Sequence, residues 1–159
     1  AMLYIAHFDL ERWQQLSTVK LIVPRAEVNT PVTEFYLGTE SWDIAPWETR
    51  IGHFQGTAGL DHPGNIVLGG HVEYPDGSNG VFHQLNQVHI GDQLQLVVGG
   101  TTRHYQVIEQ KLIPADDLTV LYPTNDEQLT LITCDEASFD PTTDTYNERL
   151  VVIARREDN

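Results

Sequence analysis

The stretch QLQLVVGGTTRHYQVIEQKLI (residues 93–113) contains two runs rich in Val, Ile, Leu and Tyr, with Gly99-Gly100 between them. Branched and aromatic side chains of these types favour extended backbone, because they pack well on a pleated surface. Two adjacent glycines allow the tight turn that joins neighbouring antiparallel strands. The stretch therefore predicts a β-hairpin with strands over 93–98 and 103–113.

Short apolar segments of similar composition recur along the chain between clusters of Gly and Pro. We predict four further strands in them, at residues 19–23, 65–69, 128–134 and 149–154. Short helical turns are expected near 46–52, 81–87 and 115–121. Many short strands with few helices predict a mostly all-β protein, built as a closed barrel or a sandwich.

The beginning of the chain has a different pattern. Apolar residues from Leu3 to Trp13 recur at spacings of three and four, which predicts an amphipathic helix that ends near residue 17. A length of 159 residues fits one domain. We therefore divide the chain into an N-terminal helical segment, 1–18, and a β domain, 19–159. We interpret Ala1-Met2 as a cloning remnant.

The composition is strongly acidic, with 23 Asp and Glu against 9 Lys and Arg and a formal net charge of −14. Such a surface repels the phosphates of nucleic acids and anionic lipid headgroups, so we expect no nucleic-acid partner. No run of about 18 apolar residues occurs, so no transmembrane helix is predicted, and no signal peptide is visible.

The only cysteine, Cys134, ends the apolar segment LTLITC and is followed by Asp135 and Glu136. One cysteine cannot form an internal disulfide, so the thiol is an inert buried group or a reactive one. A thiol acts as a nucleophile only as the thiolate, which needs a positive charge or a base nearby. The two acids would raise its pKa, so a reactive Cys134 requires a cation that offsets them.

Two segments supply candidate partners for this thiol. In GNIVLGGHVE, His71 follows an apolar run and two glycines, a position that suits a general acid or base as well as an ordinary hydrogen-bonded histidine. Arg149 begins the last predicted strand, and its guanidinium can hold a developing oxyanion or a peptide carbonyl. The alternative for Arg149 is a solvated surface arginine.

Other chemistries fit the sequence less well. His71-Val72-Glu73 matches the first half of a zinc deaminase motif, but the motif needs a second cysteine. Papain-like enzymes place the cysteine before the histidine, whereas here the order is reversed. P-loop, dinucleotide-binding and G-x-S-x-G motifs are absent. A metal site built from histidines and carboxylates without cysteine remains open, and calcium is considered only for the acidic loop 136–148.

Taken together, the three segments resemble those of the sortases, cysteine transpeptidases of bacterial cell surfaces. Thr130 to Cys134 matches the T-L-x-T-C motif of that family, and Gly64 to His71 matches its G-N-x-x-x-x-G-H segment. Arg149 is the counterpart of the family's arginine on the strand after the cysteine. The resemblance covers roughly residues 19–155.

The resemblance implies an eight-stranded closed β-barrel with short helices, to which the N-terminal helix is an addition. It implies a thiol peptidase of the hydrolase class, in which Cys134 attacks an LPxTG-like sorting signal, His71 moves protons and Arg149 holds the substrate. The acyl group then passes to an amine acceptor, a peptidoglycan cross-bridge or a pilin lysine. The resemblance implies that this chemistry needs no metal and no organic cofactor. The implied location is the extracytoplasmic face of a bacterial cell membrane, reached through an N-terminal anchor that precedes this sequence.

Within the resemblance, we expect the loop 114–126 to contact substrate side chains. We expect the loop 136–148 to gate the site or to receive the amine. Two alternatives remain: a barrel with weak or no catalysis that acts as a peptide-binding module, and an L,D-transpeptidase, whose cysteine usually follows S-x-G rather than Ile132-Thr133.

Overall fold

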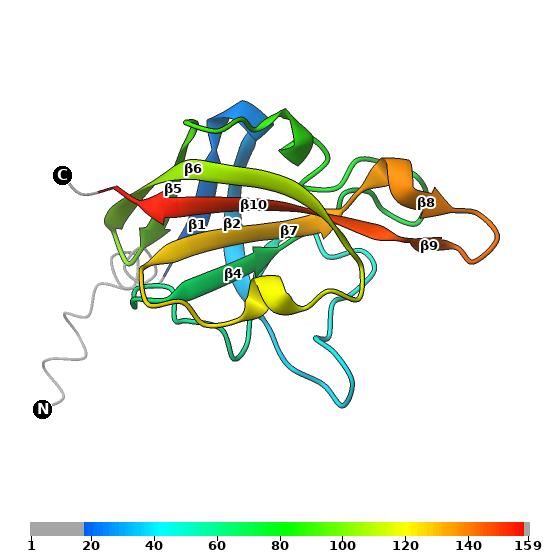
Figure 1. Ribbon diagram of the computed structural model, residues 1–159, viewed down its shortest axis with the longest axis horizontal. Helices are drawn as coiled ribbons and strands as arrows, with labels where there is room; N and C mark the ends of the chain where they lie inside the picture. The colour runs from blue at the N-terminus through cyan, green and yellow to red at the C-terminus, as the bar shows by residue number, and fades with distance from the viewer. Residues whose placement is uncertain (1–17, 158–159) are drawn as a thin grey trace, which may run out of the picture.

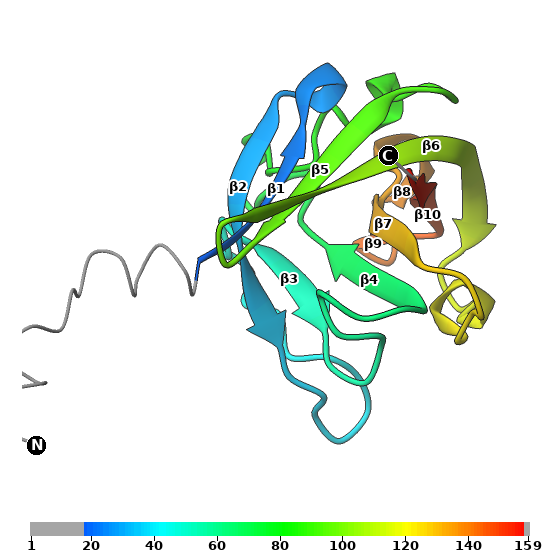
Figure 2. The ribbon, with the colours of Figure 1, turned by 90° about the vertical axis from the view of Figure 1, so that its left-hand side faces the viewer.

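Strands are the main regular elements of residues 18–157, the part of the chain that the computed structural model describes. The helix predicted over 3–17 lies outside the described residues. Eight strands form a closed barrel in the order β1-β2-β3-β4-β7-β10-β6-β5, seen from one open end in Figure 2. These strands are β1 (Val19–Val23), β2 (Val28–Phe35), β3 (Ile51–Phe54), β4 (Asn65–Gly69), β5 (Gln93–Val98), β6 (Thr101–Pro114), β7 (Gln128–Cys134) and β10 (Glu148–Arg156).

Short elements connect these strands. A small hairpin, β8 (Phe139–Asp140) and β9 (Thr145–Tyr146), projects from the barrel between β7 and β10 (Figure 1). Four 3-10 turns complete the described chain: η1 (Pro24–Ala26), η2 (Leu85–Gln87), η3 (Thr119–Leu121) and η4 (Glu136–Ser138). The predicted eight-stranded barrel with short helices is confirmed.

The β5–β6 hairpin forms as the sequence predicts. Val98 pairs with Thr101, and Gly99 and Gly100 between them both have positive φ angles, of 57° and 84°. These angles match a turn in which both central residues are left-handed, and glycine adopts them without a steric penalty. The strand β6 begins two residues earlier than predicted.

Two of the barrel pairs, β2–β3 and β4–β7, are parallel, and the other six are antiparallel. In the second parallel pair, Gly69 lies opposite Ile132. Two parallel neighbouring strands have their C-terminal ends at the same edge of a sheet. The residues that follow β4 therefore lie beside the last residues of β7, at one end of the barrel.

Apolar side chains from all eight strands fill the barrel, as expected for one of this size. Its largest completely buried side chains include Tyr105, Phe82, Leu21, Ile66, Leu94 and Leu131. Truncating such a side chain to alanine typically costs about 2–5 kcal/mol, because the lost contacts leave a cavity. The interior is therefore a packed core that holds the strand ends rigid.

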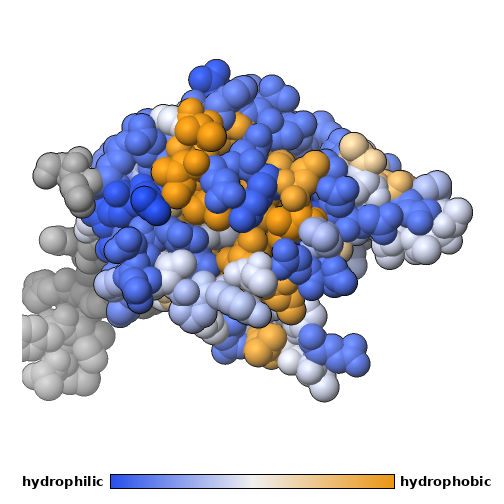
Figure 3. All heavy atoms as spheres, viewed as in Figure 1, coloured by the Kyte–Doolittle hydropathy of each residue, from blue (hydrophilic) through white to orange (hydrophobic). Residues whose placement is uncertain are grey.

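A second apolar layer lies outside the barrel. Val151 and Ile153 of β10 pack with Ile113 of β6 and with Val120, which belongs to the connection between β6 and β7. This connection is fixed by Asn65 of β4, whose Nδ2 donates hydrogen bonds to the carbonyls of Val120 (2.8 Å) and Tyr122 (3.0 Å). Figure 3 shows a band of apolar residues across the face that carries β6 and β10.

The predictions for residues 28–54 were incomplete. β2 and β3 were not predicted from their composition. Of the helical turn expected near 46–52, a single turn forms, in which the Glu48 amide donates to the Ala45 carbonyl (3.1 Å), and β3 begins at Ile51. The β2–β3 pair needs a glycine at position 52, because a Cβ there would come within 2.2 Å of the Phe35 ring on β2. The turns expected near 81–87 and 115–121 are present as η2 and η3.

Candidate active site

The three residues selected from the sequence come from neighbouring elements at one end of the barrel. His71 lies two residues beyond β4, Cys134 is the last residue of β7, and Arg149 is the second residue of β10. Arg149 is the direct partner of Cys134 across the antiparallel β7–β10 pair. All three line one cavity of about 190 Å³, which we call the thiol pocket.

Backbone contacts hold the His71 segment against β7. The Gly70 amide donates to the carbonyl of Ile132 (3.3 Å), and the hydroxyl of Thr133 donates to the Gly70 carbonyl (2.8 Å). On the other side, the amide of Phe82 donates to the His71 carbonyl (2.9 Å). The position of the imidazole relative to the thiol is thus set by hydrogen bonds on both sides of its backbone.

The side chain of His71 contacts a loop that the sequence did not link to the site. Its Nε2 lies 2.8 Å from the carbonyl oxygen of Ala45, in the connection between β2 and β3. A carbonyl only accepts, so Nε2 carries a hydrogen. In neutral His71 the lone pair is then on Nδ1, which is the nitrogen able to take up a proton. The edge of the ring also contacts Tyr74, with ring centroids 5.9 Å apart.

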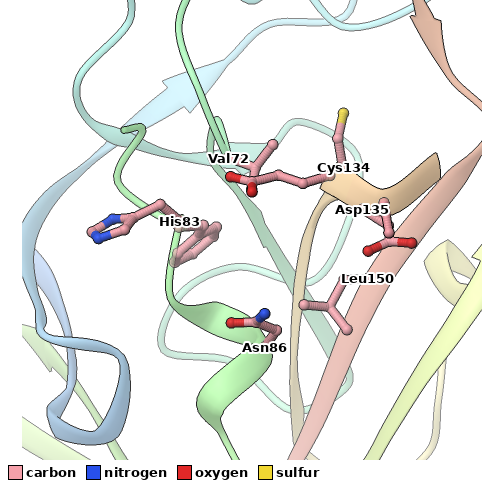
Figure 4. Close-up of a pocket in the computed structure, with 9 residues that line it drawn as sticks. Val72, His83, Asn86, Cys134, Asp135 and Leu150 are labelled. Atoms are coloured by element: carbon pink, nitrogen blue, oxygen red, sulfur yellow. The ribbon is translucent and has the colours of Figure 1, made fainter. Parts of the chain in front are cut away.

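The Cys134 thiol is mostly buried, and this burial is the largest cause that raises its pKa. The Arg149 guanidinium lowers the same pKa, and the Glu73 carboxylate raises it. The acid that acts on the thiol is therefore Glu73 rather than Asp135 or Glu136, which the sequence had indicated. In Figure 4 the Cys134 sulfur and the Asp135 carboxylate point in different directions.

The guanidinium of Arg149 is anchored by backbone oxygens. Its Nη1 donates to the carbonyls of Tyr146 (3.1 Å) and Glu148 (3.4 Å). No carboxylate within residues 18–157 forms an ion pair with it. Its charge therefore remains available to a group that enters the thiol pocket.

A second cavity of about 210 Å³ continues from the thiol pocket along the barrel end. The two cavities share four lining residues, and the second extends to Trp42 and Leu118. The shared residues are Ile44, Phe54, Ile132 and Arg149. Together they form a groove, which we call the apolar groove, that leads to Cys134 and can take an extended peptide with apolar side chains.

A tyrosine–glutamate pair lies beside the site. The hydroxyl of Tyr146, in β9, donates to Glu73 Oε1 and so joins the loop after His71 to the β8–β9 hairpin. Burial and Glu73 both raise the pKa of Tyr146. Neither residue was selected as a site residue from the sequence. His71-Val72-Glu73 was noticed only as half of a zinc motif, and nothing in the sequence links Glu73 to Tyr146.

The acidic loop 136–148 was considered for calcium. Among residues 18–157, no three His, Cys, Asp or Glu side chains are grouped so that they could hold a metal ion. Asp140 instead accepts hydrogen bonds from the amide and hydroxyl of Thr142, at 2.9 and 2.6 Å. No helix in the described part of the chain is long and apolar enough to cross a membrane.

Comparisons with known proteins point to one family. A family model described as the Sortase domain matches residues 21–157. Sortase D of Bacillus subtilis (strain 168) is 29% identical over 115 residues, an alignment that covers 72% of this chain and 52% of that protein. The chain therefore spans about half the length of this curated relative.

Solved structures have the same fold. Sortase A from Corynebacterium diphtheriae is 27% identical, with a TM-score of 0.69 over 94% of this chain and 68% of that one. A Clostridium perfringens Sortase D5 transpeptidase has a TM-score of 0.71, covers 96% and 91% of the two chains, and at 20% identity shows likeness of fold alone. The family match spans almost the whole barrel, and we conclude that this chain belongs to the sortase family.

Proposed function

We propose that the chain is a cysteine transpeptidase that cleaves an LPxTG-like sorting signal and transfers the acyl part to an amine. One observation carries the proposal: Cys134, His71 and Arg149 line the same pocket at the end of an apolar groove, in a chain of the sortase family. The apolar lining of the groove suits the Leu and Pro side chains of such a signal, whose binding there would bring its Thr carbonyl to the thiol.

In the first half-reaction, the thiolate of Cys134 attacks the Thr carbonyl carbon. The Arg149 guanidinium donates to the carbonyl oxygen as negative charge develops on it. Protonated His71 gives the proton on Nδ1 to the departing amine, the C–N bond breaks, and a thioester on Cys134 remains. The hydrogen bond from Nε2 to Ala45 keeps Nδ1 as the nitrogen that exchanges this proton.

In the second half-reaction, an incoming amine attacks the thioester carbon and gives a proton to His71. The C–S bond breaks, and the electron pair returns to the sulfur. Water in place of the amine gives hydrolysis. Burial raises the pKa of Cys134, so only a minority of molecules holds the reactive thiolate at neutral pH, and Arg149 increases this fraction.

We place the protein at the extracytoplasmic face of a bacterial membrane, held by an N-terminal anchor, where secreted proteins with sorting signals pass. The acceptor would be a peptidoglycan cross-bridge or a pilin lysine. Family membership supports this assignment. The strongly acidic composition is consistent with a partner other than nucleic acid.

Intact-protein mass spectrometry tests the proposal. The protein is incubated with a pool of LPxTG-like peptides, with and without triglycine. We expect an acyl adduct that maps to Cys134, is discharged by the amine, and is absent in Cys134→Ala. His71→Ala should slow turnover by about 10²–10⁴-fold. Absence of any adduct, together with slow alkylation of Cys134, would instead indicate a peptide-binding barrel.

A further inference from the structure

A second cavity that His71 lines has a volume of about 350 Å³. Its lining includes Glu73, Tyr74, Asp144 and Tyr146, and we call it the tyrosine pocket. The only residue that lines both the tyrosine pocket and the thiol pocket is His71. His71 therefore borders both cavities, and its Nδ1 is the nitrogen left to exchange a proton, because Nε2 is held by the Ala45 carbonyl.

From this arrangement we propose that the tyrosine pocket binds the acceptor as a primary ammonium ion. The inference rests on the proposed function, since the thioacyl enzyme must react with a second substrate while the apolar groove still holds the first. The acceptor therefore needs a separate cavity that opens on His71, which takes its proton. Within the described chain, the tyrosine pocket is a cavity of this kind outside the apolar groove.

The lining chemistry suits an ammonium ion. Glu73 and Asp144 supply negative charge, and one oxygen of Glu73 is oriented by the Tyr146 hydroxyl. The ring of Tyr74 stacks on Trp47, with ring centroids 5.9 Å apart. Carboxylates and aromatic faces are the groups that attract a primary ammonium, and the absence of lysine and arginine from this lining leaves the attraction unopposed.

A rival cavity of about 400 Å³ also touches Cys134 and carries the acids Asp135 and Glu136. It is less suitable for the acceptor, because His71 does not line it. Figure 4 shows the Cys134 sulfur pointing away from His83 and Asn86 on the opposite wall of this cavity. An amine held in the rival cavity would have no contact with His71, the base that takes its proton. It would also lie on the side of Cys134 away from which the sulfur points.

In the second half-reaction, the bound acceptor must lose two protons. The bound ammonium releases one proton to solvent and becomes the nucleophilic amine. The amine nitrogen forms a bond to the thioester carbon, its second proton passes to Nδ1 of His71, and the C–S bond breaks. The sulfur leaves as the thiolate beside protonated His71, which is the state that begins the next cycle.

The test measures how the thioacyl enzyme partitions between amine transfer and hydrolysis, because this ratio does not depend on how fast the thioester forms. Two probes are used: n-butylamine, which is an ammonium ion at neutral pH, and hydroxylamine, which is uncharged. We expect Glu73→Gln to raise the half-saturating concentration of n-butylamine by about tenfold and that of hydroxylamine by less than about twofold.

Further variants make the test specific. Tyr74→Leu keeps the charge of the pocket and removes the aromatic face. We therefore expect a smaller rise, of about threefold, in the half-saturating concentration of n-butylamine. Glu40→Gln, an exposed acid in another loop, controls for net charge and should change neither value. Glu136→Gln probes the rival cavity.

If Glu73→Gln raised the half-saturating concentrations of both amines equally, the inference would be overturned, because such a result would indicate an effect on the chemistry at Cys134 or His71. If Glu136→Gln raised the half-saturating concentration of n-butylamine and Glu73→Gln did not, the inference would be overturned in favour of the rival cavity. Failure of the wild-type protein to form any thioacyl adduct would instead refute the proposed function itself, and the adduct is read separately by mass.

Discussion

Cys134 and Arg149 are direct partners across the antiparallel pair β7–β10. Side chains at directly opposed positions leave a sheet on the same face, so the pairing register alone brings the guanidinium to the thiol. The carbonyl of Tyr146 then fixes the guanidinium at 3.1 Å. The cation that lowers the pKa of Cys134 is thus positioned by the backbone of the barrel.

Arg149→Lys should separate the charge of this residue from its geometry. Lysine keeps the positive charge but lacks the planar fork of donors that can hold an oxyanion. We expect the rate of acylation by a sorting-signal peptide to fall by about 10²–10³-fold, while the pH profile of thiol alkylation changes little. Arg155→Lys, on the exposed part of the same strand, is the control and should retain the full rate.

Glu73→Gln should shift the thiol titration. Because the Glu73 carboxylate raises the pKa of Cys134, removal of its charge should lower that pKa. The rate of alkylation by iodoacetamide, measured against pH, should then rise at lower pH than in the wild type. Asp135→Asn provides the comparison at a sequence neighbour and should shift the profile less. An equal shift in both variants would contradict the assignment of Glu73.

Thr133→Val tests the link between β7 and the His71 segment. The Thr133 side chain is buried, and its hydroxyl donates to the Gly70 carbonyl at 2.8 Å. Valine has the same shape but no donor, so the half-buried Gly70 carbonyl loses this partner. We expect the free energy of unfolding in urea to fall by about 1–3 kcal/mol. Thr133→Ser keeps the hydroxyl and should retain the hydrogen bond, with only the smaller loss due to the missing methyl group.

Glu127 at the opposite end of β7 gives a prediction about stability and pH. Burial raises the pKa of this carboxyl, but hydrogen bonds from Tyr105, Arg156 and Arg103 together lower it below its ordinary value. A carboxyl with a depressed folded pKa stabilises the protein above its unfolded pKa of about 4.3. This contribution is lost as the pH falls through the folded pKa.

Glu127→Gln should therefore lower the free energy of unfolding by about 3 kcal/mol at pH 7, since it leaves two guanidinium groups without their carboxylate. The difference from the wild type should shrink as the pH is lowered, and urea titrations at successive pH values would show this. Glu109→Gln breaks the exposed pair with Lys111 and should cost less than about 1 kcal/mol. Equal losses in both variants would rule out the network as the cause.

The strands that the sequence predicted are those whose side chains are apolar. β7 and β10 are rich in Val, Leu and Ile, and both pack between two apolar layers. β2 carries Pro31 and polar residues, and β3 has only four residues, one of them a glycine. These two strands are defined by pairing with each other and by closure of the barrel, which local composition does not encode.

The candidate site shows the same division. Cys134, His71 and Arg149 were selected because each stands at the end of a recognisable strand in a motif of the sortase family. Ala45 and Glu73 were not, because their roles depend on how loops fold over the barrel end. The sequence indicated acids next to Cys134, whereas the acid that acts on it comes from a loop distant in the chain.

The parallel β4–β7 pair has a consequence for folding. The Thr133 hydroxyl and the Gly70 carbonyl that it contacts are 63 residues apart in sequence. Closing so long a stretch of chain costs entropy before any contact compensates for it, and such pairings form slowly. The thiol and the imidazole therefore become neighbours only when the barrel is nearly complete. During refolding, the return of acyl-transfer activity should coincide with the slowest structural phase, so an incompletely folded chain has no working catalyst.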